Sequence, residues 1–493
     1  MRMPLLTAAL AMCLPGLAPE RAAAQDYQQD ALCYTGQDEI CEFLPVDLTG
    51  LKVNPGYTPN TNVATGDTAK QQNFDYFAWQ MFVALNWPSD GTGAPEGSIL
   101  DSGTLDQPRV WESWPGIEHV FGEKNDVAAT CSAGRLTLSE TNKVTSSSFI
   151  EPFTPWPLID VAGNYVMYDI RLNPIEAAYI LKNGLNTKAG QEAFGKAWDM
   201  PRGVVSSGTH DDVAAAIPGA MEMKTAWRVL PDGDDGFGYF TVPGSVYIGA
   251  DNTASGEPLC LDVTLGLVGM HIMQKITNPT DFSDFWVWAT FEHKQNAPDA
   301  ANAPVSQSNS NSPLTGNDPV ASCPVPTEVS GNFAFFNAQC TRSGNACEPN
   351  APPSGKGPFL WQDSPPYAGS YLDDGQFGTQ VTRCFDVYQS ADQVTEQFQE
   401  ALFGTPFANY QLIGAQWAQA QVVEYPDPLK PFPAPIYLVN STLETYLQNK
   451  PVIDPHTGEP NQNASGSCII CHDTATDSAG NKSDFSFLGG YAH

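Results

Sequence analysis

Residues 264–277 read TLGLVGMHIMQKIT, an apolar run of strand length that brings a histidine and two methionines close together. Side chains alternate between the two faces of a β-strand. We therefore expect His271 and Met273 to point to one face of a sheet and Met270 to the other. This stretch predicts a core strand that carries candidate metal ligands.

Further strand signals surround it. Residues 285–291 form a second apolar run, and 221–230 and 239–249 flank the turn-forming sequence PDGDDG. The pattern predicts a β-rich region over 220–293, with 221–230 and 239–249 paired as a hairpin. Residues 157–170 alternate well enough for one more strand.

Helical spacing of apolar residues is found outside this region. The clearest helices are expected at 73–87, at 174–184 and at 391–403. Ser441 and Glu444 have the spacing of a capping box, which predicts a short helix running to Leu447.

The composition sets the class of protein. The chain has 493 residues, of which 42% are hydrophobic and 11% aromatic, enough for a large packed core. It carries 23 Lys and Arg against 55 Asp and Glu, a formal net charge of -32. Such an acidic chain repels phosphates, so we expect no nucleic-acid partner.

The N-terminus has the pattern of a secretory signal peptide. Arg2, an apolar stretch over 4–17 and small residues at 22–24 predict cleavage after residue 24. No later apolar stretch reaches the ~18 residues that a membrane-spanning helix needs, so none is expected after cleavage. The expected location is the periplasm of a bacterium or the medium outside it.

The 11 cysteines divide into three groups. Cys13 is expected to leave with the signal peptide, and two cysteines lie in the segment Cys468-Ile469-Ile470-Cys471-His472. The others suit disulfides in an oxidising compartment: Cys33, Cys41, Cys131, Cys260, Cys323, Cys340, Cys347 and Cys384. Cys33 with Cys41 and Cys340 with Cys347 could close small loops, but the full connectivity is left open.

C-x-x-C-H is the spacing that attaches a c-type haem. Two thiols on one helical turn reach two vinyl groups of the haem, and the adjacent histidine is delivered to the iron. A zinc knuckle would want a second ligand pair nearby, and a redox C-x-x-C would want an early βαβ context. Here only 21 residues follow His472.

In these residues the chain resembles the c-type cytochromes at their haem-attachment site. The resemblance implies one covalent haem c on Cys468 and Cys471, with His472 as the proximal iron ligand. In the small cytochrome c domain the motif lies near the start and a later methionine ligates the iron, whereas no methionine follows His472 here. The haem is therefore expected to be covered by residues far upstream.

Two other stretches, WVWATFEH at 286–293 and NYQLIGAQW at 409–417, are similar to uncharacterised exported bacterial proteins with one haem motif near the C-terminus. This resemblance supports the haem and implies no reaction.

The sixth ligand of the iron should come from upstream. The candidates are His271, Met273 and His293, the last of which follows an aromatic stretch and Glu292. An open or water-filled position is the alternative.

The segments together predict a mixed α+β fold. It has a large β-containing body with peripheral helices, a long irregular disulfide-tied region and a short C-terminal haem-attachment helix. The expected divisions are the signal peptide 1–24, the body 25–294, a linker or insertion 295–322, the disulfide-tied region 323–440 and the haem-attachment segment 441–493, packed on the body.

Two functions follow. The first is one-electron transfer through the haem, with the acidic surface steering a redox partner protein that has a basic surface. The second is a haem-dependent oxidoreductase, peroxidase- or oxygenase-like, with an open distal site where His271 or His293, with Glu292, would move protons. The length of the chain favours the enzyme, and the motif favours the carrier.

Overall fold

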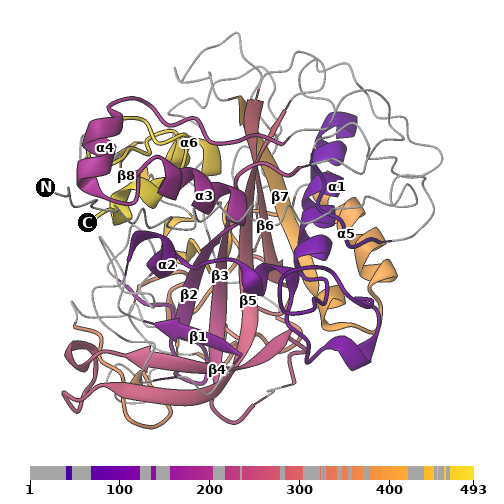
Figure 1. The fold of residues 1–493 in the computed structure, drawn as a ribbon. Helices are drawn as coiled ribbons and strands as arrows, with labels where there is room; N and C mark the ends of the chain where they lie inside the picture. Colours follow the sequence, from indigo (N-terminus) through magenta and orange to yellow (C-terminus); the bar gives the residue numbers. More distant parts are fainter. Residues whose placement is uncertain are drawn as a thin grey trace, which may run out of the picture.

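A computed structural model shows a mixed α+β fold built around one curled sheet (Figure 1). The residues that it describes are 40–46, 68–122, 131, 135–139, 151, 156–203, 217–233, 236–277, 284–301, 303, 323, 326, 329–340, 347–352, 358–369, 378–387, 389–419, 438–448, 452–453, 460–461 and 467–493. The expected signal peptide lies outside these residues.

The sheet is organised around its longest strand. The strands are β1 (Leu136–Ser139), β2 (Val166–Leu172), β3 (Met221–Leu230), β4 (Thr241–Ile248), β5 (Leu259–Thr277), β6 (Asp284–His293) and β7 (Tyr410–Gln419). They follow the order β1-β4-β5-β3-β2, and β6 pairs with the second half of β5 and with β7. All of these pairs are antiparallel except β1 with β4.

Helices cover both faces of this sheet. They are α1 (Thr68–Leu85), α2 (Ile117–Phe121), α3 (Pro174–Lys182), α4 (Lys188–Phe194), α5 (Gln389–Ala401) and α6 (Cys468–His472). In Figure 1, α1 and α5 lie to one side of β6 and β7, and α2, α3, α4 and α6 lie to the other. A small ladder pairs β8 (Val452–Ile453) with β9 (Pro460–Asn461).

Aromatic side chains fill the face under α1 and α5. Trp79 and Phe82 of α1 pack on Phe291 of β6, with ring centroids 5.0 and 4.4 Å apart. Met270 of β5 is buried in the same cluster. The opposite face carries a second cluster that includes Met273, Trp288 and side chains of the C-terminal segment. The helices predicted at 73–87, 174–184 and 391–403 are confirmed with small shifts of their ends.

Three sequence predictions of local structure are wrong. The runs 221–230 and 239–249 form no hairpin, because β5, with 19 residues, is long enough to pair with both β3 and β4 and lies between them. In the stretch 157–170 only the last residues belong to a strand, since β2 begins at Val166. At 441–447 the Ser441 hydroxyl donates to the Glu292 carboxylate, so it caps no helix, and only a 3-10 turn follows.

Parts of the expected linker and of the expected disulfide-tied region contact the sheet of the body. Residues 295–301, expected to begin the linker, are packed, with the Asn296 side chain donating to the Val268 carbonyl. The strand β7 lies within 323–440 yet pairs with β6 of the body. Residues 304–322 lie outside the described part of the chain.

One disulfide ties an irregular segment to β5, and two others join residues outside the strands. The structure pairs Cys340 with Cys347, as expected, and also Cys131 with Cys260 and Cys323 with Cys384. Cys41 is also disulfide-bonded, and Cys33 lies outside the described residues. Within the described part of the chain, no helix is long and apolar enough to span a membrane.

Candidate functional site: the turn that carries C-x-x-C-H

The five residues of the motif form the helix α6. Its first turn is anchored to β7, because the Ile469 N–H and the Ser467 hydroxyl both lie within reach of Gln416 Oε1, at 3.3 and 3.4 Å. An α-helix has 3.6 residues per turn, so Cys468 and Cys471 lie on one side of it. The thiols therefore have the arrangement that the motif predicts.

The two thiols of α6 stand apart from the other described cysteines, which are in disulfides. Both are only half-buried at the residue level. Burial raises the pKa of Cys471 to about 12, and the charge of Glu444 adds to this effect. Burial also holds the pKa of Cys468 well above its ordinary value. Both groups are therefore neutral thiols at physiological pH.

His472 is held by a backbone carbonyl. Its Nδ1 lies 2.7 Å from the Phe485 oxygen. A carbonyl can only accept a hydrogen bond, so Nδ1 carries the proton and Nε2 keeps its lone pair. Burial lowers the pKa of His472 to about 4, which keeps the ring neutral at pH 7. A neutral imidazole with Nδ1–H bound to a carbonyl is the state in which histidine ligates a metal.

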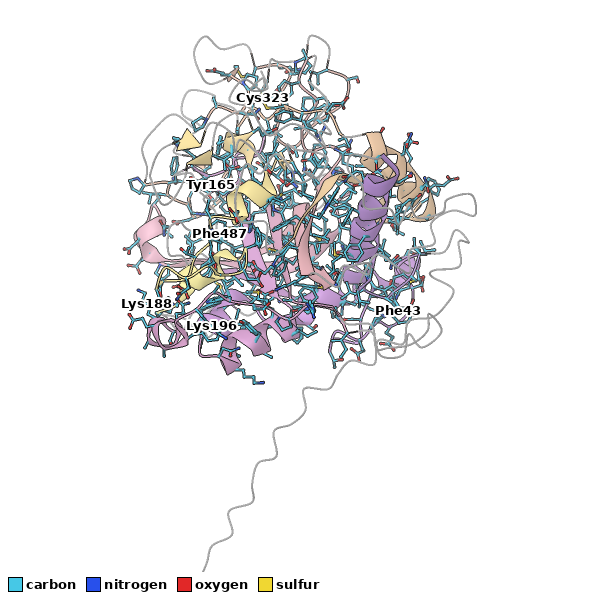
Figure 2. The ribbon with its side chains drawn as sticks, turned by 90° about the horizontal axis from the view of Figure 1, so that it is seen from above. Phe43, Tyr165, Lys188, Lys196, Cys323 and Phe487 are labelled. Atoms are coloured by element: carbon cyan, nitrogen blue, oxygen red, sulfur yellow. A yellow bond between two sulfur atoms is a disulfide. The ribbon has the colours of Figure 1, made fainter. Side chains whose placement is uncertain are left out.

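Aromatic rings surround this histidine. The centroid of its ring lies 5.8 Å from that of Trp288 and 5.1 Å from that of Phe487. Trp288 meets Phe485 edge-on at 5.6 Å. Figure 2 shows Phe487 among the packed side chains of the C-terminal segment. The imidazole of His472 therefore lies among apolar aromatic rings.

The register of the sheet shows which residues share the α6 face. His271 of β5 lies opposite Lys224 of β3 and Thr290 of β6. Met273 lies opposite Trp288 and belongs to the cluster under α6. The expected alternation of His271 and Met273 against Met270, on the α1 side, is thus confirmed.

His271 is paired with a carboxylate. Its Nε2 lies 3.3 Å from Glu444 Oε2, close enough for an ion pair but without the alignment of a hydrogen bond. Burial acts to raise the pKa of Glu444, but His271, Lys224 and the Asn440 N–H hold it below its ordinary value. The charge of His271 also acts to lower the pKa of His472. The structure therefore brings His271 to the neighbourhood of α6.

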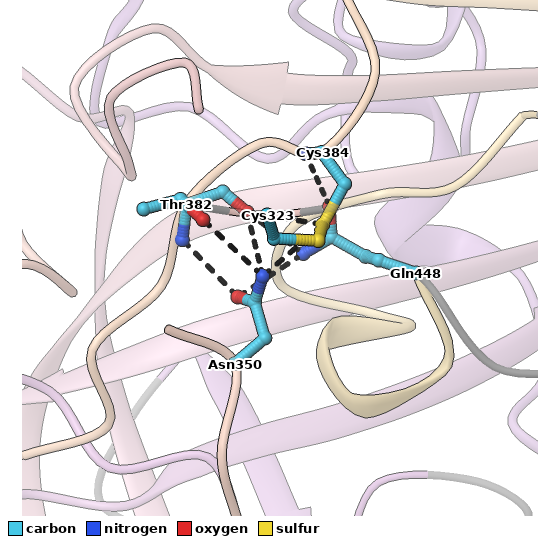
Figure 3. The surroundings of a disulfide bond; sticks show 5 residues. All are labelled: Cys323, Asn350, Thr382, Cys384 and Gln448. Atoms are coloured by element: carbon cyan, nitrogen blue, oxygen red, sulfur yellow. Dashed lines mark hydrogen bonds between the residues drawn. A yellow bond between two sulfur atoms is a disulfide. The ribbon is translucent and has the colours of Figure 1, made fainter. Parts of the chain in front are cut away.

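Glu444 is positioned by a segment that the disulfide region supports. Residues 438–448 carry Glu444, and Gln448 at their end accepts a hydrogen bond of 3.0 Å from the Cys384 N–H (Figure 3). Cys384 is bonded to Cys323, and Asn350 donates to the neighbouring Thr382 carbonyl at 3.0 Å. Hydrogen bonds from this buried polar cluster thus hold one end of the segment 438–448, which carries Glu444.

His293 lies elsewhere. Its offset from Thr290 along β6 puts it on the opposite face from His271. It is fully buried between Tyr239 and Tyr410, at ring distances of 4.2 and 5.3 Å, and its Nδ1 accepts from the Gln295 N–H. The structure does not bring this candidate to His472.

Glu292 is the residue that the sequence suggested as a partner of a distal histidine in proton transfer. In the structure it is bound by other side chains of the body. Its carboxylate binds the Arg383 guanidinium and accepts from Ser441.

Several residues of the site carry no signal in the sequence. Lys224 lies near α6 because of the register of β3 against β5. Glu444 lies there because residues 438–448 pack against this face of the sheet. Phe485 contributes a backbone oxygen, which its side chain does not reveal. Within the described residues, no group of three or more His, Cys, Asp and Glu side chains could hold a metal ion. A haem iron needs no such group, because the porphyrin supplies four of its ligands.

A buried carboxyl pair lies beside the site. Glu176 of α3 is fully buried, and burial together with the neighbouring Glu222 carboxyl raises its pKa well above its ordinary value. Burial also raises the pKa of Glu222 to about 7, although a hydrogen bond from Ser486 opposes this. Glu176 is thus protonated in the folded chain at a pH where it is ionised in the unfolded chain.

This pair predicts a pH-dependent stability. Between about pH 5 and the raised pKa, the folded state holds a proton on Glu176 that the unfolded state has lost. The contribution of Glu176 to the free energy of unfolding is therefore largest at acidic pH. It falls by about 1.4 kcal/mol per pH unit as the pH rises through this range. A Glu176→Gln variant should show a flatter decline in urea unfolding from pH 5 to 8. Glu192→Gln, an exposed change on α4, should keep the wild-type slope; equal slopes for Glu176→Gln and wild type would contradict the prediction.

Comparison with protein-family models, with curated proteins and with solved structures finds no match.

Proposed function

We propose that this chain holds one covalent haem c on Cys468 and Cys471, with His472 as proximal ligand, and transfers single electrons. The observation that carries the proposal is the pairing of two unbridged thiols on one turn with a histidine whose Nδ1 lies 2.7 Å from the Phe485 oxygen. Bound haem iron would supply a reversible ferric–ferrous couple. The chain itself attaches, orients and covers the group.

The residues around α6 suit a haem. Cys468, Cys471 and His472 are all half-buried, so each has surface that a further group can cover. One buried nitrogen on this side, Trp288 Nε1, has no hydrogen-bond partner among the described residues. Buried polar atoms are nearly always satisfied, so this nitrogen leaves room for a further group on this side.

His271 is our choice for the sixth ligand. It shares the sheet face with α6, it influences the pKa of His472, and the partner of its Nε2 among the described residues is the Glu444 carboxylate, 3.3 Å away. Met273 lies opposite Trp288 in the sheet and belongs to the same buried cluster as Trp288 and Phe485, which lie around His472. We therefore expect it on the same side of a bound haem as His472.

The visible spectrum tests this assignment. A His271→Ala variant should change a low-spin, six-coordinate haem into a high-spin haem that binds carbon monoxide rapidly in the ferrous state, because the sixth ligand is lost. Met273→Leu and His293→Gln serve as matched controls and should keep the low-spin spectrum. A His271→Ala protein that stays low-spin would rule out His271 as the ligand.

A haem-dependent oxidoreductase is the second candidate. The 3.3 Å approach of His271 Nε2 to Glu444 favours it, because a histidine beside a carboxylate can take up and return a proton next to a bound substrate. A wild-type protein that is already high-spin and binds cyanide in the ferric state would favour the enzyme over the carrier.

We further propose that the protein acts outside the cytoplasm, where its disulfides are stable, and exchanges electrons with a protein of basic surface. The formal charge of -32 supports this partner, since it attracts positive surfaces over long range. Raising the salt concentration should then slow the exchange.

A further inference from the structure

The Phe485 carbonyl that holds His472 belongs to an unusual piece of backbone. Asp484 and Phe485 are consecutive non-glycine residues with φ angles of 55° and 67°. L-residues other than glycine rarely adopt this left-handed backbone region, and for a bulky residue such as Phe485 it is a true outlier. Such a conformation persists only where the surroundings impose it.

The Asp484 side chain supplies that constraint. It is 5% exposed, and its Oδ2 accepts from the Lys275 ammonium and the Met200 N–H, each at 2.7 Å. Its Oδ1 accepts from Trp286 Nε1 at 3.1 Å. The donors come from β5, β6 and the segment after α4, so three separate parts of the body fix this one carboxylate.

Lys275 makes the anchor strong. Its side chain is 1% exposed, so its charge is removed from water and needs a partner. Its other partner, Asp199, lies 2.9 Å away but is 85% exposed. Of these two carboxylates Asp484 is therefore the buried one, and a relaxed turn would leave the buried Lys275 ammonium to Asp199 at the surface.

We propose that Asp484 is a positioning residue for the iron ligand. By holding the left-handed turn, it keeps the Phe485 carbonyl against the Nδ1–H of His472 and so sets the donor strength of His472 toward the iron. The part concerning the iron rests on the proposed function, and the part concerning the tautomer of His472 does not.

The direction of the effect follows from the hydrogen bond. A carbonyl that accepts from Nδ1–H makes the imidazole a more basic ligand, which favours the ferric state. A loosened turn should therefore raise the midpoint potential of the haem.

The experiment compares Asp484→Ala and Asp484→Asn with Asp477→Ala, in full-length protein. Asp477 is a matched control in the same C-terminal segment, because it is also buried and accepts from an indole N–H, that of Trp198, and from backbone N–H groups. None of its hydrogen bonds among the described residues involves Phe485 or Lys275. Asparagine tolerates positive φ and keeps one acceptor, so Asp484→Asn should fold even if Asp484→Ala does not.

Two readouts are used. In the holoprotein, Asp477→Ala should keep the wild-type midpoint potential. Asp484→Asn should raise the midpoint potential, and Asp484→Ala should raise it further. In the haem-free full chain, ¹⁵N NMR of His472 should show the Nδ1–H tautomer for wild type and Asp477→Ala, and a mixture of tautomers for the Asp484 variants. Circular dichroism checks that each variant is folded.

The outcomes separate the two ideas. A folded Asp484→Asn protein with the wild-type potential and the wild-type tautomer overturns the positioning role. A wild-type chain in which His472 carries its proton on Nε2 overturns it as well. A wild-type chain that carries no covalent haem refutes the proposed function, while the NMR arm still decides whether Asp484 fixes the tautomer.

Discussion

A Cys468→Ala, Cys471→Ala double variant should lose all covalently held haem, so that acidified organic solvent extracts any haem that it still binds. Wild-type protein should keep its haem through the same extraction, because in the proposed site each thiol would form a thioether to one vinyl group. The measurement is the absorbance of the protein after extraction, together with the mass of the intact chain. The expected change is complete loss.

The control removes two cysteines of a different kind. Cys340 and Cys347 are bonded to each other across a separation of 7 residues and belong to a different segment of the chain. A Cys340→Ala, Cys347→Ala variant should keep its covalent haem. If the Cys468 and Cys471 double variant also kept it, the attachment site would have to lie outside α6.

Arg383→Met should lower the free energy of unfolding by about 3–5 kcal/mol. Glu292 is completely buried in β6, and Arg383 Nε donates to its Oε1 at 2.7 Å. Removing the guanidinium leaves a buried carboxylate with only the Ser441 N–H, the Ser441 hydroxyl and a long contact to Gln411. Urea unfolding at pH 7 measures the loss.

The double variant Glu292→Met, Arg383→Met supplies the internal control. It removes both charges and should be less destabilised than Arg383→Met alone, because no unpaired charge remains. Lys482→Met, which breaks a half-exposed pair with Asp473, should cost less than about 1 kcal/mol. If Arg383→Met lowered the free energy of unfolding by less than about 1 kcal/mol, the prediction would be contradicted, and Glu292 would have to be accessible to water.

The sequence could predict the parts of the site that depend on local pattern. The spacing of Cys468, Cys471 and His472 depends only on one helical turn. The shared face of His271 and Met273 depends only on strand alternation. Both predictions concern residues within a few positions of each other.

The parts that depend on pairing between distant strands could not be predicted. His293 has the same residue type as His271, but the register of β5 against β6 puts it on the other face. The run 239–249 has a good turn before it, yet β4 pairs with the long β5 and not with β3. Ser441 has capping-box spacing, but the buried Glu292 competes for its hydroxyl.

The contacts that hold the C-terminal segment have a kinetic consequence. Trp286 with Asp484, Lys275 with Asp484, and Trp198 with Asp477 join residues 198, 209 and 279 positions apart in the chain. Contacts this distant form only after long loops have closed, so they come late in folding. The surroundings of His472 thus form only once the sheet has assembled, so in the proposed haem protein ligation of His472 would report completion of the whole fold.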